Sequence, residues 1–211
     1  MKKNHIITSI RILFLLLFFV LLKNDKLIIW LILFGASLLL APFFGRIYCG
    51  YICPMNTVMI PTDSFAKKLK LKTDKTPKWL SSGNFAWFTL FISIGVFIFT
   101  RKVVNRNFPV LIVWLVLSVL ITLRYKTSIF HNLICPFGKL QESFGKFAQR
   151  SHKVDIDKCI GCKLCEKVCP NESVVVDAVS KKATIDPALC LQCSNCEMVC
   201  PTKAIAYTKN R

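Results

Sequence analysis

The chain has 211 residues, of which 54% are hydrophobic, and a formal net charge of +18 at pH 7 from 29 Lys and Arg against 11 Asp and Glu. Its mean hydropathy is +0.50, which indicates a membrane protein carrying a polar module and argues against a small secreted disulfide scaffold. The basic excess comes with no nucleic-acid-binding motif, so we expect it to hold loops at an anionic membrane surface and expect no nucleic-acid partner.

Four apolar segments come first in the chain, each near the lower length limit for crossing the hydrocarbon layer. They are Ile6–Leu22, Leu27–Phe44, Phe85–Thr100 and Phe108–Leu123. No small-residue cleavage site follows the first, so we interpret it as a retained helix and not as a signal peptide. Lys23–Lys26 is short enough to be a hairpin turn. We therefore predict an all-α, four-helix membrane domain over residues 1–140.

Lys and Arg are distributed unequally between the two sides that these spans define. The richer side carries both chain ends and most of the lysines, whereas the poorer side carries few beyond the cluster Arg101, Lys102 and Arg106. The positive-inside rule then predicts a multi-pass protein of the inner (cytoplasmic) membrane, with both termini and the cysteine-rich tail in the cytoplasm.

Several isolated side chains have two interpretations. Arg11 lies inside the first span, where a charge is costly, so it is either functional or snorkels to the membrane surface. We expect Arg46 and Arg124 to be topology anchors and His5 and His152, which have no partner pattern, to be surface residues.

Aromatic residues and a basic segment complete the membrane part. We expect Trp30, Trp87 and Trp114 to pack against lipid or helices, and Trp79 to be an interfacial anchor. The segment Asp63–Lys72 is predicted either as a short interfacial helix or as a solvated basic loop.

A short motif is repeated after the second and fourth spans. Ile47–Pro54 superimposes on Ile129–Pro136 after a shift of 82 positions, with Cys53 on Cys135, Pro54 on Pro136, and His131 where the first copy has Cys49. The membrane domain is thus a duplicated helical hairpin, and a two-fold arrangement would bring the two motifs face to face. Cys49, Cys53, His131 and Cys135 are then candidate ligands of an additional iron–sulfur or metal site. The alternatives are a Cys49/Cys53 dithiol, or small buried residues beside an interfacial histidine.

The tail carries the other eight cysteines in two copies of the pattern C-x2-C-x2-C-x3-C-P. These runs begin at Cys159 and Cys190. Three thiolates two residues apart can hold three corners of a [4Fe–4S] cube, and the fourth, followed by proline, ligates the other cube. We predict two [4Fe–4S] clusters, one on Cys159, Cys162, Cys165 and Cys200 and the other on Cys190, Cys193, Cys196 and Cys169. Zinc sites use pairs of C-x2-C and fit this pattern less well.

The rest of the tail is predicted as a small α+β fold. A connector helix over residues 141–153, with Gln141–Arg150 as its clearest part, precedes a ferredoxin domain over residues 154–211. Strands are expected at Val154–Ile156 and Ile205–Tyr207, paired with each other. A hairpin is expected around Ser180–Lys182, and short helices after each C-x3-C-P.

The tail resembles the bacterial 2[4Fe–4S] ferredoxin domain. Four spans, the two C-P motifs and this tail together resemble the NapH-type membrane quinol dehydrogenase subunits and related polyferredoxin-like membrane proteins. In that family both membrane motifs carry two cysteines, and this chain departs from the pattern at His131. The resemblance implies quinol oxidation that feeds a terminal reductase in anaerobic respiration.

Cubes ligated by four thiolates have no open coordination position, so one-electron transfer is the simplest role. The leading hypothesis is an electron-transfer subunit, not a stand-alone enzyme. It would relay electrons between the quinone pool, as substrate, and a redox partner protein or reductase subunit. The alternatives are a redox-sensing, metal-sensing or maturation accessory protein, and a membrane anchor with structural clusters.

Overall fold

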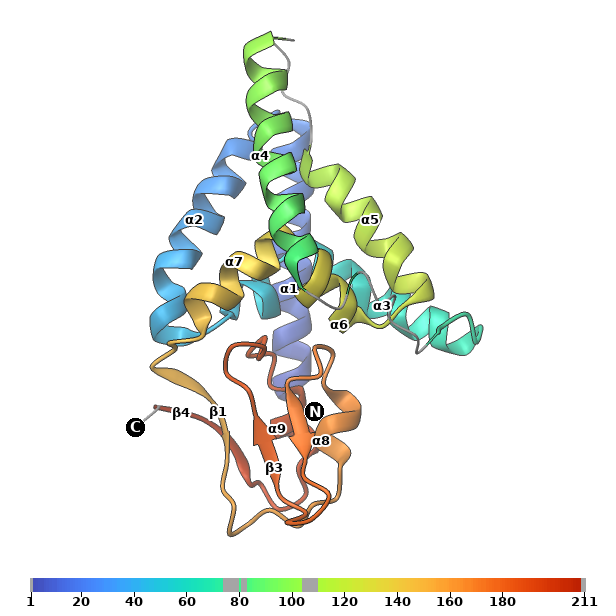
Figure 1. Cartoon of the computed structure of the whole chain (residues 1–211), viewed down its shortest axis with the longest axis vertical. Helices are drawn as coiled ribbons and strands as arrows, with labels where there is room; N and C mark the ends of the chain where they lie inside the picture. The colour runs from blue at the N-terminus through green and yellow to red at the C-terminus, as the bar shows by residue number, and fades with distance from the viewer. Residues whose placement is uncertain (1, 74–79, 81–82, 104–109, 210–211) are drawn as a thin grey trace.

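The computed structural model describes residues 2–73, 80, 83–103 and 110–209, and it consists of a helical part above a small cysteine-rich tail (Figure 1). The helical part contains α1 (Lys2–Lys23), α2 (Leu27–Phe44), η1 (Tyr48–Ile52), α3 (Pro54–Lys68), α4 (Asn84–Val103), α5 (Val110–Arg124), α6 (Thr127–Ile129), η3 (Phe130–Ile134) and α7 (Pro136–Gly145). The tail contains β1 (Arg150–Val154), α8 (Leu164–Val168), β2 (Val174–Val176), β3 (Ala183–Ile185), α9 (Asn195–Val199) and β4 (Ile205–Lys209).

The two halves of the helical part use the same helix pairings. In the first half α1 packs against η1 and α3; in the second half α4 packs against η3 and α7. The halves also exchange their last helices, because α3 packs on α5 and α7 packs on α2. This arrangement agrees with an internal duplication, and it places both motifs near the middle of the molecule, just above the tail (Figure 1).

A proline fixes the backbone at both motifs. Cys53 and Cys135, which precede prolines, have extended backbone with ψ of 119° and 116°, as the proline ring requires of its predecessor. The π-helical turns end there, closed by hydrogen bonds from Cys53 N to Tyr48 O (2.9 Å) and from Cys135 N to Phe130 O (2.8 Å). α3 and α7 then begin on the prolines, which suit the first helical position.

The tail is built from two short antiparallel ladders. β1 pairs with β4 in the register Val154 with Ile205, and β2 pairs with β3 in the register Val174 with Ile185. Both predicted strand pairings are therefore present, although β1 lies almost entirely before the predicted Val154–Ile156. Cys165 and Cys196 lie buried in the small core between these ladders.

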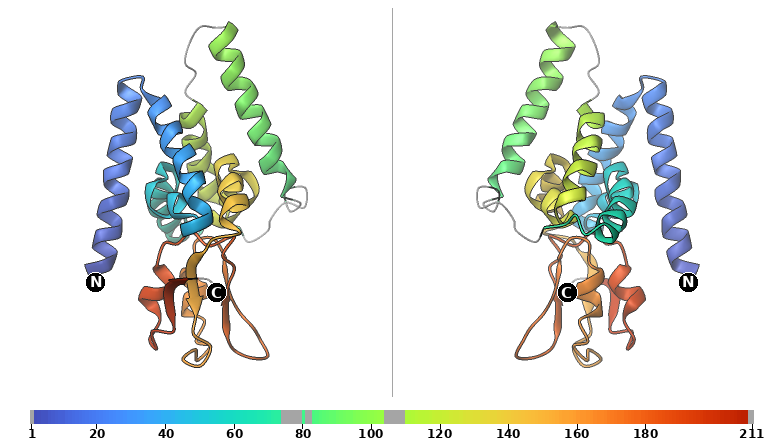
Figure 2. Two further views of the ribbon diagram at one scale, coloured as in Figure 1. Left: turned by 90° about the vertical axis from the view of Figure 1, so that its left-hand side faces the viewer. Right: turned by 90° about the vertical axis from the view of Figure 1, so that its right-hand side faces the viewer.

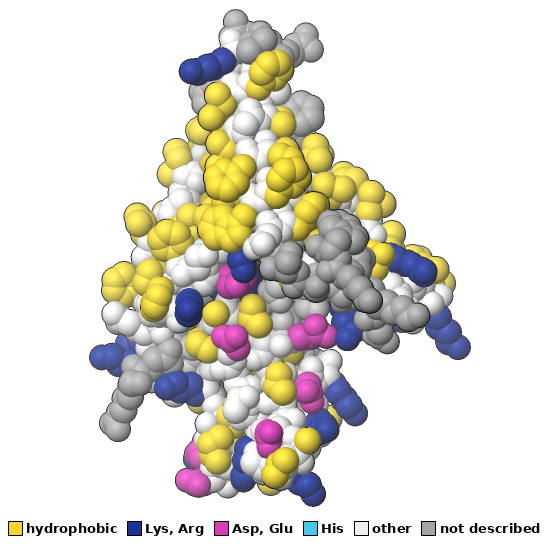
Figure 3. All heavy atoms as spheres, viewed as in Figure 1, with side chains coloured by type: hydrophobic (Ala, Val, Ile, Leu, Met, Phe, Trp, Pro, Cys, Tyr) yellow, Lys and Arg dark blue, Asp and Glu magenta, His cyan; other side chains and the backbone are white. Residues whose placement is uncertain are grey.

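Two helices carry enough apolar length to cross a membrane. Among the described residues these are His5–Lys23 and Leu27–Phe44, and α4 and α5 hold shorter apolar stretches. Large apolar side chains cover the face over α2, α4 and α5, whereas most charged side chains gather lower, around α3 and the tail (Figure 3). By length and composition, these helices indicate membrane association only weakly.

Some sequence-based predictions differ from the structure. The connector over 141–153 is not one helix, because α7 ends at Gly145 and β1 begins at Arg150. In the tail the short helices α8 and α9 each contain the third cysteine of their run and end just before the fourth, so they do not follow the proline. The helix expected at Asp63–Lys72 is the end of α3, which stops at Lys68. Trp79 lies outside the described residues.

Candidate iron–sulfur site

The eight tail cysteines line two separate cavities. Cys159, Cys162, Cys165 and Cys200 line one cavity, which we call the distal set; Cys169, Cys190, Cys193 and Cys196 line the other, the proximal set. This partition is the same as the one predicted from the motif, in which each run lends its fourth cysteine to the other run. Assignment of either set as cluster ligands remains part of the proposal below.

The backbone of each loop curves around its cavity through the same three positions. The third residue of each run, Gly161 in the first and Gln192 in the second, has positive φ. They occur again before the short helices, at Lys163 and Ser194, and after the closing prolines, at Glu172 and Lys203. Left-handed backbone at these positions bends the chain tightly, so the cysteines of one run face a common space.

The donor set fits a cluster better than a single metal ion. Within the part of the chain that the structure describes, no three His, Cys, Asp or Glu side chains converge closely enough to hold one ion. The thiols instead surround a cavity, as ligands of a cube must. All eleven cysteines are unpaired by disulfides, and backbone N–H groups of Ser173 and Ala204 point at the sulfurs of Cys169 and Cys200, both at 3.3 Å. Such N–H donors stabilise ligated thiolates.

The proximal set lies against the helical part on its first-motif side. An ideal Cβ on Gly50 would come within 2.1 Å of Leu191 O, so only glycine allows this approach. Arg11, which is buried, donates from Nε to Gly50 O at 2.8 Å. Tyr207 Oη donates to Phe44 O at 3.0 Å. Arg11 therefore ties α1 to the segment that meets the proximal loop.

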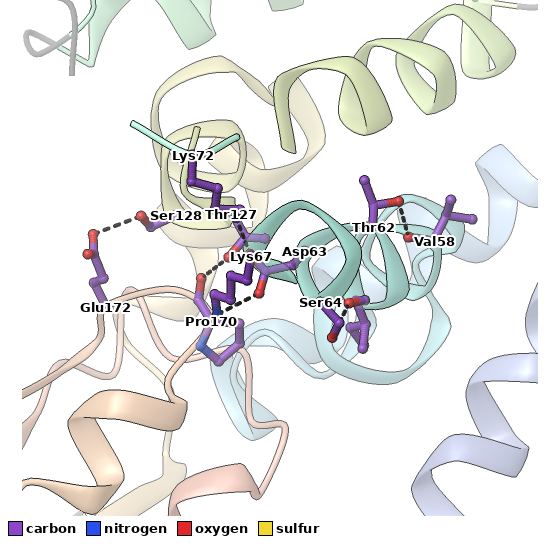
Figure 4. Close-up of polar contacts among 11 residues, drawn as sticks. Val58, Thr62, Asp63, Ser64, Lys67, Lys72, Thr127, Ser128, Pro170 and Glu172 are labelled. Carbon is purple, nitrogen blue, oxygen red and sulfur yellow. Dashed lines mark hydrogen bonds and ion pairs between the residues drawn. The ribbon is translucent and has the colours of Figure 1, made fainter. Parts of the chain in front are cut away.

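The segment just before the second motif contacts the loop that follows Cys169 (Figure 4). Thr127 Oγ1 donates to Pro170 O at 2.5 Å, and Ser128 Oγ donates to a Glu172 carboxylate oxygen at 2.7 Å. Lys126 Nζ forms an ion pair with the other oxygen of Glu172 at 2.9 Å. Asn132, within the second motif, donates from Nδ2 to Asn171 O at 3.4 Å, so both motifs of the helical part contact loops that carry proximal cysteines.

This second contact should weaken in acid. Partial burial acts to raise the pKa of Glu172, but the hydrogen bonds from Ser128 and Lys126 outweigh it and hold that pKa below its ordinary value of 4.5. The stabilising contribution is therefore present above about pH 4.5 and is lost as the pH falls through the lower folded-state pKa. We expect E172Q to destabilise the folded protein by at most about 1 kcal/mol at pH 7, because the ion pair is partly exposed.

Thermal unfolding of E172Q at pH 7 and pH 4 provides the measurement. The unfolding temperature of E172Q should fall less between pH 7 and pH 4 than that of the wild type. E142Q is the matched control, because Glu142 pairs with Lys139 on its own helix and does not touch the tail. If E172Q and E142Q changed the pH dependence of thermal stability equally, the contact of Glu172 with Lys126 and Ser128 would not be its source.

The three motif cysteines share one buried cluster above the proximal set. Cys49, Cys53 and Cys135 belong to the same apolar core as Leu191 and Cys193 of the tail. Burial raises the pKa of Cys53 and raises that of Cys135 to about 12. Burial also raises the pKa of Cys49, with the Arg46 guanidinium beside it acting in the opposite direction. The structure thus brings the three predicted thiols together.

His131 lies near these thiols but has its own partner. Its ring is buried and its Nε2 lies 3.2 Å from Asn56 Oδ1. Burial, with the charge of Arg46, lowers the pKa of His131 to about 3, so the ring is neutral. Since no described set of three ligands can hold one ion, a single-metal site on Cys49, Cys53, His131 and Cys135 receives no support.

Two residues of this region have contacts that the sequence did not predict. Arg46 is 0% exposed and donates from Nη1 to Ala188 O of the tail at 3.3 Å. Its Nε and Nη2 have no hydrogen-bond partner among the described residues. His152 is also buried, not exposed, and is bonded to Gln192 and Glu197. The residues around Arg46 and His152 in the sequence do not indicate that they are buried, because the tail buries them when it docks on the helical part.

Comparison with known proteins agrees with the cysteine geometry. A family described as "4Fe-4S binding domain" matches residues 27–72 and again residues 107–154, one match for each motif. A second, "4Fe-4S dicluster domain", matches residues 158–204. The two matches of the first family support the internal duplication.

Two relatives match about two thirds or more of this chain. The chain is 28% identical over 164 residues to an uncharacterised protein of Methanocaldococcus jannaschii, which covers 77% of this chain and 66% of the relative. It is 28% identical over 159 residues to the methylamine utilization ferredoxin-type protein MauN of Methylobacillus flagellatus, which covers 67% of this chain and 54% of that one. The chain thus spans between half and two thirds of these relatives, and no solved structure matches it. The two family matches and the two four-cysteine cavities support a ferredoxin-type iron–sulfur protein.

Proposed function

We propose that this protein is a membrane-anchored relay that moves electrons between the quinone pool and a redox partner protein. The observation that carries the proposal is the position of the proximal set, whose loops contact both motifs of an apolar helical part. The eight tail cysteines would hold two [4Fe–4S] clusters, and a bound cluster supplies one-electron chemistry without an open coordination position.

The two cysteine sets would mark the two ends of the relay. Cys193 is buried against the helical part, in the same core as Cys49 and Cys53. Cys162, in the distal set, is exposed, and its neighbours Ile160 and Leu164 are 64% and 41% exposed. Electrons would therefore enter beside Cys193, from a donor in the membrane, and leave beside Cys162 to a protein in the cytoplasm. The apolar side chains around Cys162 suit docking of such a partner.

The buried thiols above the proximal set extend this proposal. Arg46 is fully buried and, among the described residues, forms no ion pair with Asp or Glu. A buried guanidinium normally has an anionic partner, because desolvation of an unpaired charge is costly. A thiolate or an anionic iron–sulfur centre on Cys49, Cys53 and Cys135 would supply one.

The test is reduction of the purified full chain by a quinol analogue under anaerobic conditions, with no partner protein present. We expect the visible absorbance of oxidised iron–sulfur clusters to bleach and an EPR signal of reduced clusters to appear. A sensor, a maturation factor or a structural anchor does not need this reaction. Intact clusters that stay oxidised with excess quinol would contradict the proposal, provided dithionite reduces them.

A further inference from the structure

A cavity of about 500 Å³ lies between the N-terminal end of α1, η1 and the tail. That end of α1 reaches down to the level of the tail (Figure 2), so the cavity lies where the helical part meets the polar domain. Its volume is that of a small-molecule site. Its lining has two chemistries: Ile10 and Phe14 of α1 are apolar, whereas Tyr51, Ser194 and His152 carry polar groups.

The polar groups on one side form a hydrogen-bonded line. Tyr51 Oη lies 3.5 Å from Ser194 Oγ, which lies 3.2 Å from His152 Nε2. The same ring nitrogen lies 3.2 Å from a carboxylate oxygen of Glu197, whose side chain is 27% exposed. A proton released in the cavity thus has a connected route of hydroxyl, imidazole and carboxylate groups toward solvent.

The same side of the cavity adjoins the proximal set. Ser194 follows Cys193 directly in the chain, and its left-handed backbone, with φ of 61°, begins α9. A group that bonds the Ser194 hydroxyl is therefore close to a proximal cysteine. Arg11 bonds Gly50 O and keeps α1 against η1, so the two segments that line this side of the cavity are held together.

We infer that this cavity binds the head group of a membrane quinone, an inference that rests on the relay function proposed above. One quinone oxygen would bond both Tyr51 and Ser194, whose hydroxyls lie 3.5 Å apart, and the prenyl tail would pass Phe14 toward the lipid. In the oxidation of a quinol both O–H bonds break and two carbonyl groups form. Two oxidised [4Fe–4S] clusters held by the tail cysteines would take up the two electrons, one each, and the two protons would pass by way of Ser194 and His152 to solvent.

The apolar cavity among α2, α4, α5 and α7 is the competing position. It has a volume of about 170 Å³, and Ser93 is the sole polar side chain among the described residues that line it. It can take a hydrocarbon chain, but its described lining lacks a pair of hydroxyl groups for a quinone oxygen. The α1 cavity is therefore the better match to an amphipathic ligand.

The experiment uses photolabelling of the anaerobically purified full chain with an azido-benzoquinone that carries a short prenyl chain. We expect labelled peptides from α1 near Phe14 and from η1 near Tyr51, and loss of that label when unmodified quinone is in excess. The F14W substitution fills the cavity and should reduce the label at Tyr51 severalfold. Y125F is the control, because Tyr125 lies at the end of α5, away from the cavity. Label confined to α4 near Leu90 and Phe97 and to α5 near Leu111 would overturn the inference.

Steady-state reduction by a quinol analogue gives a second readout. We expect S194A and Y51F each to raise the half-saturating quinol concentration about tenfold, as loss of one ligand hydrogen bond does. An unchanged half-saturating concentration in S194A, Y51F and F14W would refute the cavity while leaving the relay intact. Label in the α1 cavity together with clusters that quinol never reduces would refute the relay but retain the binding site.

Discussion

Replacement of Cys193 by serine is expected to stop quinol-driven reduction of the protein, whereas replacement of Cys162 by serine is not. Cys193 belongs to the proximal set, buried against the helical part, and Cys162 belongs to the exposed distal set. If electrons enter at the proximal set, loss of a proximal ligand interrupts the relay before the distal set. Loss of a distal ligand leaves the entry point intact and instead abolishes transfer to a soluble acceptor protein.

The measurement compares the two variants by anaerobic quinol titration followed by EPR. Iron analysis first establishes that each retains about four irons in the untouched set. We expect quinol to reduce the clusters that remain in C193S no faster than the background rate without quinol. The clusters that remain in C162S should be reduced at close to the wild-type rate. Equal quinol reduction of both variants would show that the entry point is not on the proximal side.

The second large effect is expected from G50A, which changes no ligand. The added Cβ would lie 2.1 Å from Leu191 O and 3.3 Å from Leu191 C, both backbone atoms. Since neither the π-helical turn nor the proximal loop can yield easily, the tail must separate from the helical part. Overpacking of this kind costs about 1–3 kcal/mol. We expect the tail to keep its iron but to accept electrons from quinol at least tenfold more slowly.

G35A is the matched control for that substitution. A Cβ on Gly35, in the middle of α2, meets no atom within 4 Å, and alanine favours helix over glycine. Its stability should equal or slightly exceed that of the wild type, with normal reduction kinetics. Limited proteolysis of residues 146–149 should be faster in G50A alone. Identical behaviour of the two alanine variants would contradict close docking at Leu191.

The elements set by local sequence were predicted closely. α2 coincides with the predicted segment Leu27–Phe44, and the other apolar segments lie within or nearly within α1, α4 and α5. The division of the eight tail cysteines between two cavities also follows the motif. Helix periodicity, prolines and cysteine spacing act over a few residues, so the sequence alone is sufficient for them.

The parts that depend on docking between distant segments could not be predicted. Gln192 bonds His152 across 40 residues, and Arg46 meets Ala188 across 142. The burial of Arg46 and His152 therefore could not be predicted from the residues around them. The cavity between α1 and the tail arises in the same way, since Phe14, Tyr51 and Ser194 come from three separate segments. The burial of Arg46 near the thiols of the two proline-closed motifs likewise depends on the folded chain and could not be predicted from the sequence.

The most direct test of the account is iron and acid-labile sulfide per chain in protein purified without oxygen, with EPR of the dithionite-reduced sample. Two four-iron clusters on the tail predict about eight irons and eight sulfides, and a surplus of iron would place a further centre on Cys49, Cys53 and Cys135. Zinc in place of iron, or a colourless protein with its tail thiols oxidised to disulfides, would contradict it.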